Sequence, residues 1–423
     1  MSVKHYNWKD GPDLIQQHSV AKHKILQSYL AAYFKTLVSS PNQDELRLTI
    51  VDGFAGGGQY YHHDTNEVVM GSPFVCLNAT KEADFELNRN RKKPLKLDVD
   101  YFFIESNKHA YQHLDKVLRE EGYAANLNRN IHLKHGKFQN HVDNILDFIK
   151  NKSPRNGRSI FILDQYGYKE VPTLLIQNIF AKLPSAEVIL TFGIDSFVNF
   201  ASDKNLTKEL LDEVGISDIL EGKSIEDIKS SERNWRYFLQ STLYRSLVSK
   251  CGAEYFTPFF IRNNNGHGDY WLIHMSQHFK ARDVMTQVHW DNHNHFIHYG
   301  GSGLNMFQMV GYDPDYDADF LKQSKLGFEF DNVAKNLSIS ALREQIPRLI
   351  YANNDGMTFG ELFAKTCNGS PASASIYQET IHQILQEKIV EVTGVAGEIR
   401  RSALQIKNND QITPSNQRKL FIF

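Results

Sequence analysis

One stretch of the sequence places an acid and clustered glycines directly after an apolar run. The run LTIV at 48–51 predicts a buried strand, because parallel strands covered on both faces are continuously aliphatic. The loop DGFAGGG at 52–58 lets a ligand approach the backbone closely. A phosphate-binding loop would continue with Lys and Ser or Thr, whereas Gln59 and Tyr60 follow here. Asp52 suits the cationic amino-acid end of S-adenosylmethionine, which we expect this loop to bind.

A second strand-like run, SIFILDQYGY at 159–168, ends in an acid, an amide and aromatic residues. A carboxylate at Asp164 could accept N–H bonds from an acceptor amine and hold its nitrogen in line with a methyl donor. A tyrosine ring could stack on a planar substrate. We therefore predict Asp164, Gln165 and Tyr166 as catalytic residues. The alternative is an aspartate that caps the next helix.

Two further strand-like runs end near residues that fit the same cofactor. Glu105 closes the run at 101–105, where an acid in nucleotide-binding folds accepts the ribose hydroxyls. The alternative for Glu105 is an acid that stabilises a helix N-terminus. The run at 131–134 leads into HGKF, where we expect Phe138 to contact the cofactor. The predicted cofactor-binding residues are Asp52, Gly53, Phe54, Ala55, Gly56, Gly58, Glu105, Ser106, Phe138 and Asp164.

Substrate contacts are predicted at Lys22, His23, Tyr60 and Tyr168. Lys22 and His23 lie at the start of an apolar helical face, so a solvated helix start is the alternative. A histidine-rich run at 289–298 contains turn residues and no regular pair of histidines on one helix face. No metal site is expected there.

These residues need a sheet that brings strand ends together. A helix is predicted at 19–38, followed by alternating strand-like and helical patterns, which indicate a mostly parallel, doubly wound α/β sheet with ligands at the carboxyl strand ends. The last two strands are joined by a short polar link, typical of an antiparallel hairpin. A helical insertion is expected at about 202–245 and an exposed excursion at 84–98. The predicted strands are 47–52, 101–105, 131–134, 159–164, 187–192, 255–261 and 270–275.

A second domain is predicted at 331–423, after a first domain at 1–330. Helical patterns at 338–351 and 373–388 flank a capping-box signature at Thr358. Short β-like runs follow at 389–393 and 420–423, which together predict a winged helix-turn-helix. The outward face of the last helix is polar rather than cationic, so nucleic-acid binding and protein contact both stay open.

Composition excludes several classes of protein. The 423 residues carry a formal charge of −2, so no global attraction to nucleic acid is built in. The three cysteines show no paired spacing, which indicates buried thiols rather than a disulfide framework or zinc site. No apolar run approaches the ~20 residues of a membrane span, and the amino-terminal segment lacks a secretion signal. We therefore expect a cytoplasmic protein that does not contact membranes.

The motifs taken together resemble the three-Cys-motif partner family. Those that carry the resemblance are, in order, KHKILQSYL, VDGFAGGGQY, MGSPFVCL, FFIES, FILDQYGY and YWLIHMSQHFKARDVM. The resemblance covers about 20–312 and the tail. It implies a Rossmann-like class I methyltransferase fold, S-adenosylmethionine as cofactor, and a separate three-Cys-motif protein as partner.

The glycine loop also has the form D-x-F-x-G-x-G of amino-directed methyltransferases, and DQYG resembles their D-P-P-Y signature. By this resemblance Asp52, Phe54, Gly56 and Gly58 belong to the cofactor loop, and Asp164 and Tyr166 to the catalytic signature. The chain departs from the signature at Gln165 and Gly167, where proline and tyrosine are expected.

The predicted function is methyl transfer to an amino nitrogen, most simply of a nucleobase in RNA or DNA. The alternative is a degenerate methyltransferase fold that binds nucleic acid or the three-Cys-motif protein without catalysis. Modification of a protein or peptide is a third reading, and the oligomeric state stays open.

Overall fold

The computed structural model describes residues 8–9, 11–15, 17–62, 64–165, 170–193, 212, 235–261, 270–292, 297–298, 302–304, 328–353 and 355–415. The chain divides into two compact units. The first unit comprises Met1–Ser231 and Thr242–Val288, and the second comprises Glu232–Ser241 and His289–Phe423. By compactness, residues 289–330 therefore group with the C-terminal unit, whereas the sequence places the boundary at 330.

Seven described strands of the first unit form one sheet, in the order β9-β10-β8-β7-β2-β5-β6. The five strands β8, β7, β2, β5 and β6 are parallel to one another. β10 lies between β8 and β9 and runs antiparallel to both. This arrangement is that of class I methyltransferases and confirms the predicted fold class and all seven strands. The link at 262–269 lies outside the described residues. The strands are β2 (Glu45–Asp52), β5 (Lys96–Glu105), β6 (Ile131–His135), β7 (Ser159–Leu163), β8 (Ala186–Phe192), β9 (Tyr255–Ile261) and β10 (Tyr270–Ser276).

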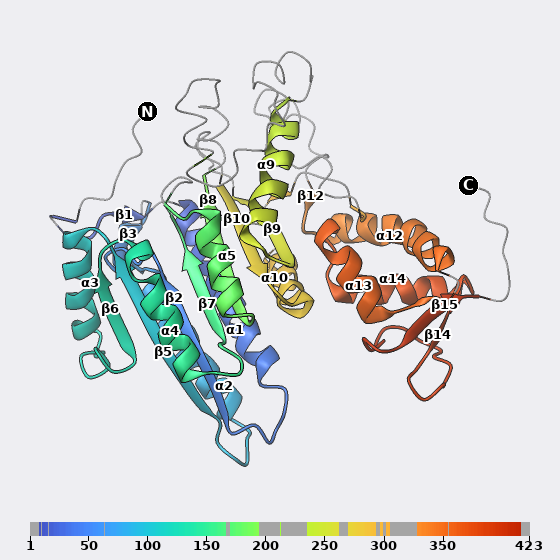
Figure 1. The fold of residues 1–423 in the computed structure, drawn as a ribbon, viewed down its shortest axis with the longest axis horizontal. Helices are drawn as coiled ribbons and strands as arrows, with labels where there is room; N and C mark the ends of the chain where they lie inside the picture. The colour runs from blue at the N-terminus through green and yellow to red at the C-terminus, as the bar shows by residue number, and fades with distance from the viewer. Residues whose placement is uncertain are drawn as a thin grey trace. The chain divides into compact units, whose positions relative to one another are not determined.

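Helices cover both faces of this sheet. In Figure 1, α4 and α5 lie in front of the sheet, and α1 and α2 lie behind it. The expected excursion at 84–98 is wrong in part, because α2 continues to Asn88 and β5 already begins at Lys96. The expected insertion at 202–245 is described only at residue 212 and within α9. The helices are α1 (Gln17–Leu37), α2 (Ser72–Asn88), α3 (Lys108–Glu120), α4 (Val142–Lys152), α5 (Thr173–Lys182), α9 (Trp235–Cys251) and α10 (Phe279–Asp291), with a 3₁₀ turn η1 (Phe138–Asn140).

A buried polar cluster fixes α1 on the sheet. The Tyr29 hydroxyl donates to Glu187 of β8, and His274 Nε2 of β10 lies 2.8 Å from the same carboxylate oxygen. Burial and the neighbouring carboxylate raise the pKa of Tyr29 well above its usual range, so the hydroxyl keeps its proton. Tyr29 lies seven residues after Lys22, two turns along one helix face. The cluster therefore sets where Lys22 lies over the sheet.

A small second sheet covers the glycine loop. β1 (Leu14–Ile15) pairs with β3 (Gln59–His62), and β3 pairs with β4 (Val68–Met70). Trp8 packs beside Tyr60, with ring centroids 5.1 Å apart. Trp8 and β1, both ahead of α1, therefore contact the segment that follows the glycine loop.

Among its described residues, the second unit contains the helices α12, α13 and α14 and a three-stranded sheet, the composition of a winged helix. Thr358 and Glu361 form the expected capping box at the start of α13. The strand that pairs with β14 is β15, and the run at 420–423 lies outside the described residues. The elements are β11 (Ile297–His298), β12 (Phe328–Glu329), α12 (Asn332–Ala352), β13 (Met357–Thr358), α13 (Phe359–Thr366), η4 (Cys367–Gly369), α14 (Ala374–Gln386), β14 (Val390–Thr393) and β15 (Gln411–Pro414).

None of the helices in the described part of the chain has the length and apolarity that crossing a membrane requires.

Candidate functional site

The glycine loop runs across the carboxyl ends of the parallel strands. Gly53 N donates to Ile162 O of β7 at 2.9 Å, and Ala55 N donates to Ile104 O of β5 at 2.9 Å. A Cβ on Gly53 would meet Leu163 at 2.9 Å and Phe138 at 3.2 Å, so a larger residue where the loop leaves β2 would require these side chains to shift. The loop thus lies where ligands bind in open α/β sheets.

Gly56 requires glycine for two reasons. Its φ is +62°, a left-handed conformation that costs other residues about 1–2 kcal/mol. A Cβ there would lie 2.2 Å from the Tyr60 hydroxyl. Farther along the loop, Gly58 O accepts from Gly71 N at 2.8 Å, just before α2. The loop is therefore tied to the strands on one side and to α2 on the other.

Asp52 faces into the protein rather than into an open cradle. Its exposed fraction is 0%, and its carboxylate accepts from Ser72 Oγ at 2.6 Å and from Phe54 N at 3.1 Å. Burial raises the pKa of Asp52 to about 7, and the two hydrogen bonds oppose the shift. In this conformation Asp52 shapes the loop between β2 and α2.

The raised pKa makes the stability of the protein depend on Asp52 and pH. Between about pH 4 and 7 the folded chain holds a proton that the unfolded chain has released, so stability falls as pH rises through this window. Asp52→Asn keeps an acceptor for Phe54 and a donor for Ser72 without this penalty. We expect Asp52→Asn to become more stable relative to the wild type as the pH rises. The difference between their unfolding free energies should increase by about 4 kcal/mol from pH 4 to pH 7. Urea denaturation of both proteins from pH 4 to 8 measures it, and a difference independent of pH would contradict the assignment.

Glu105, at the end of β5, lies beside the same loop. Its carboxylate accepts from Gly56 N at 2.8 Å and from Asn107 N at 2.6 Å. Burial raises the pKa of Glu105, and these backbone hydrogen bonds limit the rise. Ser106 next to it is exposed. Phe138 is buried against Phe161, so its ring forms part of the wall beneath the loop.

Asp164, just past β7, is ion-paired with Lys22 of α1. Lys22 Nζ lies 2.5 Å from Oδ1 and 2.6 Å from Oδ2 of Asp164, so the ammonium spans both carboxylate oxygens. Lys22 is 9% exposed, whereas the Asp164 side chain is 33% exposed. The structure thus brings a predicted substrate residue and a predicted catalytic residue into direct contact.

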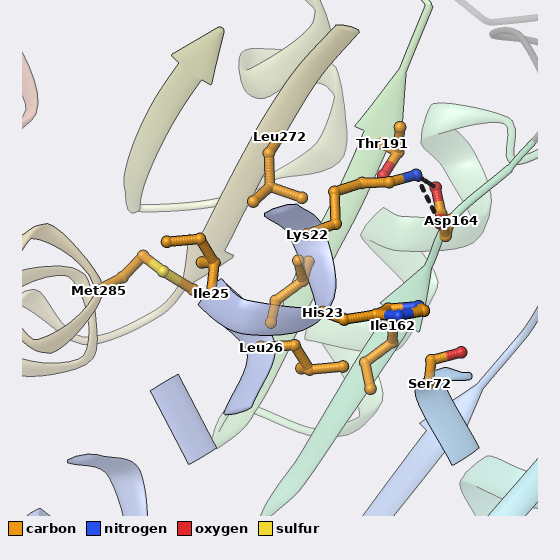
Figure 2. A pocket seen from close by; sticks show the side chains of 11 residues that line it. Lys22, His23, Ile25, Leu26, Ser72, Ile162, Asp164, Thr191, Leu272 and Met285 are labelled. Atoms are coloured by element: carbon orange, nitrogen blue, oxygen red, sulfur yellow. Dashed lines mark hydrogen bonds and ion pairs between the residues drawn. The ribbon is translucent and has the colours of Figure 1, made fainter. Parts of the chain in front are cut away.

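Figure 2 shows Lys22 and His23 extending from α1 toward the end of β7, beside Ser72. Burial and the Lys22 ammonium lower the pKa of His23 to about 4, while Asp164 acts in the opposite direction. The imidazole is therefore neutral near pH 7. Its Nδ1 is enclosed and has no hydrogen-bond partner among the residues that the structure describes.

The same side chains line a cavity of about 30 Å³, which has room for about one or two water molecules. Its remaining walls are mostly apolar and come from α1, β7, β8, β10 and α10. A planar ligand that occupies this cavity must therefore displace the Lys22 side chain.

Gln165 holds the backbone rather than a substrate in this structure. It is 2% exposed, and its Oε1 accepts from Val171 N at 2.9 Å. The side chain thereby connects the chain just after β7 to Val171, shortly before α5. Its Nε2 is buried without a partner among the described residues. Tyr166 and Tyr168, predicted for catalysis and substrate binding, lie outside the described residues.

Tyr60 is 9% exposed and packs within the small sheet that covers the loop. Trp8 lies over Gly57, where a Cβ would come within 2.2 Å of the indole ring. His113 Nδ1 donates to Gly57 O at 2.7 Å from α3. Tyr60 therefore supports the glycine loop, and the predicted substrate contact stays a prediction.

Two site residues were missed in the sequence. Ser72, the hydrogen-bond donor to Asp52, precedes a proline at the start of α2. The Ser-Pro pair after Gly71 is the sequence signal that indicates a helix start at this position. Thr191, which lines the cavity, interrupts the apolar run of β8. A polar residue near the carboxyl end of a buried parallel strand is typical of a ligand site.

Metal ligands are a separate question. Across the residues that the structure describes, no three His, Cys, Asp or Glu side chains gather in a way that could hold a metal ion. His293 and His295 of the histidine-rich run lie outside those residues.

A family model matches part of the C-terminal unit. Residues 311–397 match the family described as GMT-like wHTH domain, which agrees with the winged helix predicted there. A comparison with curated proteins gives no match.

One solved structure similar to the chain is a protein from Legionella pneumophila assigned to DUF519. The two sequences are 12% identical, and the alignment covers 62% of this chain and 85% of that chain, with a TM-score of 0.35. A second is a putative S-adenosyl-L-methionine-dependent methyltransferase from Methanococcus maripaludis, at 13% identity over 66% and 97% of the chains, with a TM-score of 0.26. A third is TYW2 of M. jannaschii in complex with AdoMet, at 11% identity over 62% and 75%, with a TM-score of 0.23.

Proposed function

We propose that the protein is an S-adenosylmethionine-dependent methyltransferase that acts on an amino nitrogen of a nucleobase in RNA or DNA. One observation carries the proposal. The glycine loop after β2, Glu105 after β5 and the Lys22–Asp164 pair after β7 all lie at the carboxyl edge of one parallel sheet. That edge is where such folds bind ligands.

The residues at the loop fit the proposed cofactor. Gly56 and Gly57 carry no side chains of their own, and Tyr60 and Trp8 pack closely against them. Glu105 offers carboxylate oxygens that could accept ribose hydroxyls. Asp52 would act through Ser72 and the loop backbone, because it is buried. When bound, the cofactor would supply an electrophilic methyl group on its sulfonium.

The acceptor side would be formed by Asp164 and the residues around it. The carboxylate would accept an N–H bond from the acceptor amine, hold the nitrogen lone pair toward the methyl donor, and take up the proton that the methylated nitrogen releases. His23 is neutral near pH 7 and can contribute a further hydrogen bond. The winged-helix unit supports a nucleic acid as the carrier of the base.

A second candidate function is a non-catalytic partner protein that keeps the methyltransferase fold and binds nucleic acid or a three-Cys-motif protein. The Lys22–Asp164 ion pair favours it, because the ammonium holds both oxygens that an amine would need. The two functions differ in whether a methyl group is transferred.

Calorimetry and label transfer test the proposal. We expect the full chain to bind S-adenosylmethionine and to transfer a tritiated methyl group to RNA or DNA from cells. Asp164→Asn should still bind the cofactor but lose transfer, because an amide can accept one hydrogen bond but carries no charge. Asp143→Asn, an exposed ion-pair residue on α4, is the matched control.

Absence of cofactor binding by the wild type would overturn the proposal. Binding without transfer to any macromolecule would support the non-catalytic partner. Transfer to protein alone would overturn the nucleobase, and label uptake that survives in Asp164→Asn would contradict the role of the carboxylate.

A further inference from the structure

We propose that a cavity at the amino edge of the first unit's sheet, where its parallel strands begin, is a second binding site. It would take a small organic acid that also carries an N–H donor. The cavity has a volume of about 410 Å³, within the range of about 300–1,000 Å³ that is typical of small-molecule sites. Its lining comes mainly from α1, the start of β8, the end of β10 and the start of α10, all within the first unit.

This cavity is separate from the predicted cofactor and acceptor sites. Arg158, which lines it, directly precedes β7, whereas Asp164 directly follows that strand. Glu187 lines it near the start of β8, whereas Thr191, near the other end of β8, lines the small cavity beside Asp164. At about 3.3 Å per residue, the backbones of Arg158 and Asp164 lie about 20 Å apart. A ligand here would therefore occupy the opposite edge of the sheet from the glycine loop.

Arg158 offers a cation that the described residues leave without an anion. Its backbone is held in place, because its carbonyl accepts from Thr49 N at 3.1 Å. Its side chain is half-buried, and the guanidinium makes no hydrogen bond or ion pair with any residue that the structure describes. Lys280, also in the lining, has its ammonium nitrogen 2.9 Å from Asp283 Oδ2 and is therefore paired. A planar guanidinium binds carboxylate or phosphate through paired hydrogen bonds, so Arg158 suits the acid group of a ligand.

Two buried polar side chains of the lining are also available to a ligand. Tyr33 is 5% exposed, and its hydroxyl has no hydrogen-bond partner within the described part of the chain. Burial and the Glu187 carboxylate raise the pKa of Tyr33 well above its usual range, while Arg158 acts in the opposite direction. The hydroxyl therefore keeps its proton and can donate. Glu187 Oε2 is engaged by Tyr29 and His274, whereas its Oε1 accepts no hydrogen bond from a described residue.

These three groups define the chemistry of the ligand. Its acid group would bind to Arg158, and an amine or other N–H group would donate to Glu187 Oε1. Tyr33 lies close enough to both charges for each to shift its pKa, so its hydroxyl could donate to the acid group as well. A nucleoside monophosphate with an amino-bearing base and a long amino acid such as lysine both present this pattern. Apolar walls suit the carbon skeleton between the two polar ends, and they include Leu37, Pro184, Ala186 and Val284.

Calorimetry with two probes tests the site and distinguishes these sources of the ligand. Adenosine 5′-monophosphate (AMP) and L-lysine are each titrated into the full chain, and we expect at least one to bind at millimolar concentration or below. Arg158→Gln removes the charge and keeps a polar side chain, so it should weaken that binding by at least about tenfold. Tyr33→Phe should weaken it by about threefold or more. Thermal unfolding of Tyr33→Phe should stay unchanged, because the hydroxyl it removes has no partner among the described residues.

Two control variants locate the binding. Arg155→Gln removes an exposed arginine that also precedes β7 but does not line the cavity, so the affinity should stay the same. Gly56→Ala disturbs the glycine loop, where an added Cβ would meet Tyr60, and should leave binding in the cavity intact.

Each outcome decides the inference. Binding that depends on Arg158 supports the site: AMP alone identifies a nucleotide, L-lysine alone identifies an amino acid, and both together show that the shared chemistry decides. Failure of both probes to bind would overturn the site. Undiminished affinity in Arg158→Gln, or an equal loss in Arg155→Gln, would overturn it too. Binding of AMP that falls only in Gly56→Ala would place the nucleotide at the glycine loop and leave the cavity without this role.

Discussion

Asp164→Ala should destabilise the protein by about 3 kcal/mol, because it leaves the Lys22 ammonium buried without its carboxylate. The figure lies at the low end for a broken buried pair, since a third of the Asp164 side chain is exposed and solvent screens part of the charge. The double variant Lys22→Met with Asp164→Leu should recover most of the loss, because apolar side chains can replace a buried ion pair at little cost. Urea denaturation of the full chain measures each step.

The Lys182–Asp143 pair is the matched control. Its Nζ–Oδ1 distance is 3.0 Å, but its side chains are 38% and 71% exposed, so Asp143→Ala should change stability little. Equal losses in Asp164→Ala and Asp143→Ala would show that burial of Lys22 does not matter. The expected loss is also why the catalytic role of Asp164 is best tested with asparagine, which keeps the shape of the side chain.

Gly56→Ala should weaken S-adenosylmethionine binding by at least about tenfold and lower stability by about 1–2 kcal/mol. The new Cβ would meet the Tyr60 hydroxyl at 2.2 Å, so either the buried Tyr60 ring or the loop, which Glu105 and β5 hold in position, must shift. The strain at φ +62° adds to that displacement. Calorimetry measures the affinity, and thermal unfolding measures the stability.

Tyr60→Phe separates these two causes. Combined with Gly56→Ala, it removes the hydroxyl that the new Cβ would meet and should restore part of the affinity, while the backbone strain stays. Gly122→Ala is the control, because its φ is +85° and no atom lies within 4 Å of the added Cβ. It should lose stability through strain alone and keep full affinity. Undiminished binding by Gly56→Ala would contradict the placement of the cofactor at this loop.

Local patterns predicted much of the fold. Strand-like runs between helical patterns located all seven strands of the first sheet, and those buried on both faces, such as β2, β7 and β8, are nearly continuous apolar runs. The capping box at Thr358 was equally local and equally correct. The run LFIF at 420–423 lies outside the described residues, so the strand expected there stays a prediction, whereas QITP at 411–414, which pairs with β14, was not predicted as a strand.

The candidate site was predictable in position but not in contacts. Asp52, Glu105 and Asp164 follow strands, so their shared edge follows from the topology alone. What each carboxylate touches depends on residues distant in the chain: Ser72 covers Asp52, and Lys22 reaches Asp164. Gln165 departs from the resembled signature, and only the structure reveals that its side chain closes the segment to Val171.

The Lys22–Asp164 contact also bears on how the first unit folds. The two residues are 142 positions apart, and α1 can deliver Lys22 only after β7 has joined the sheet. Closing so long a loop is slow because it costs conformational entropy, and the contact stabilises the chain only once the two ends have met. During synthesis, Lys22 emerges long before its carboxylate exists. The Lys22–Asp164 contact therefore forms only after β7 has been made, and a chain stalled before β7 would carry the glycine loop without it.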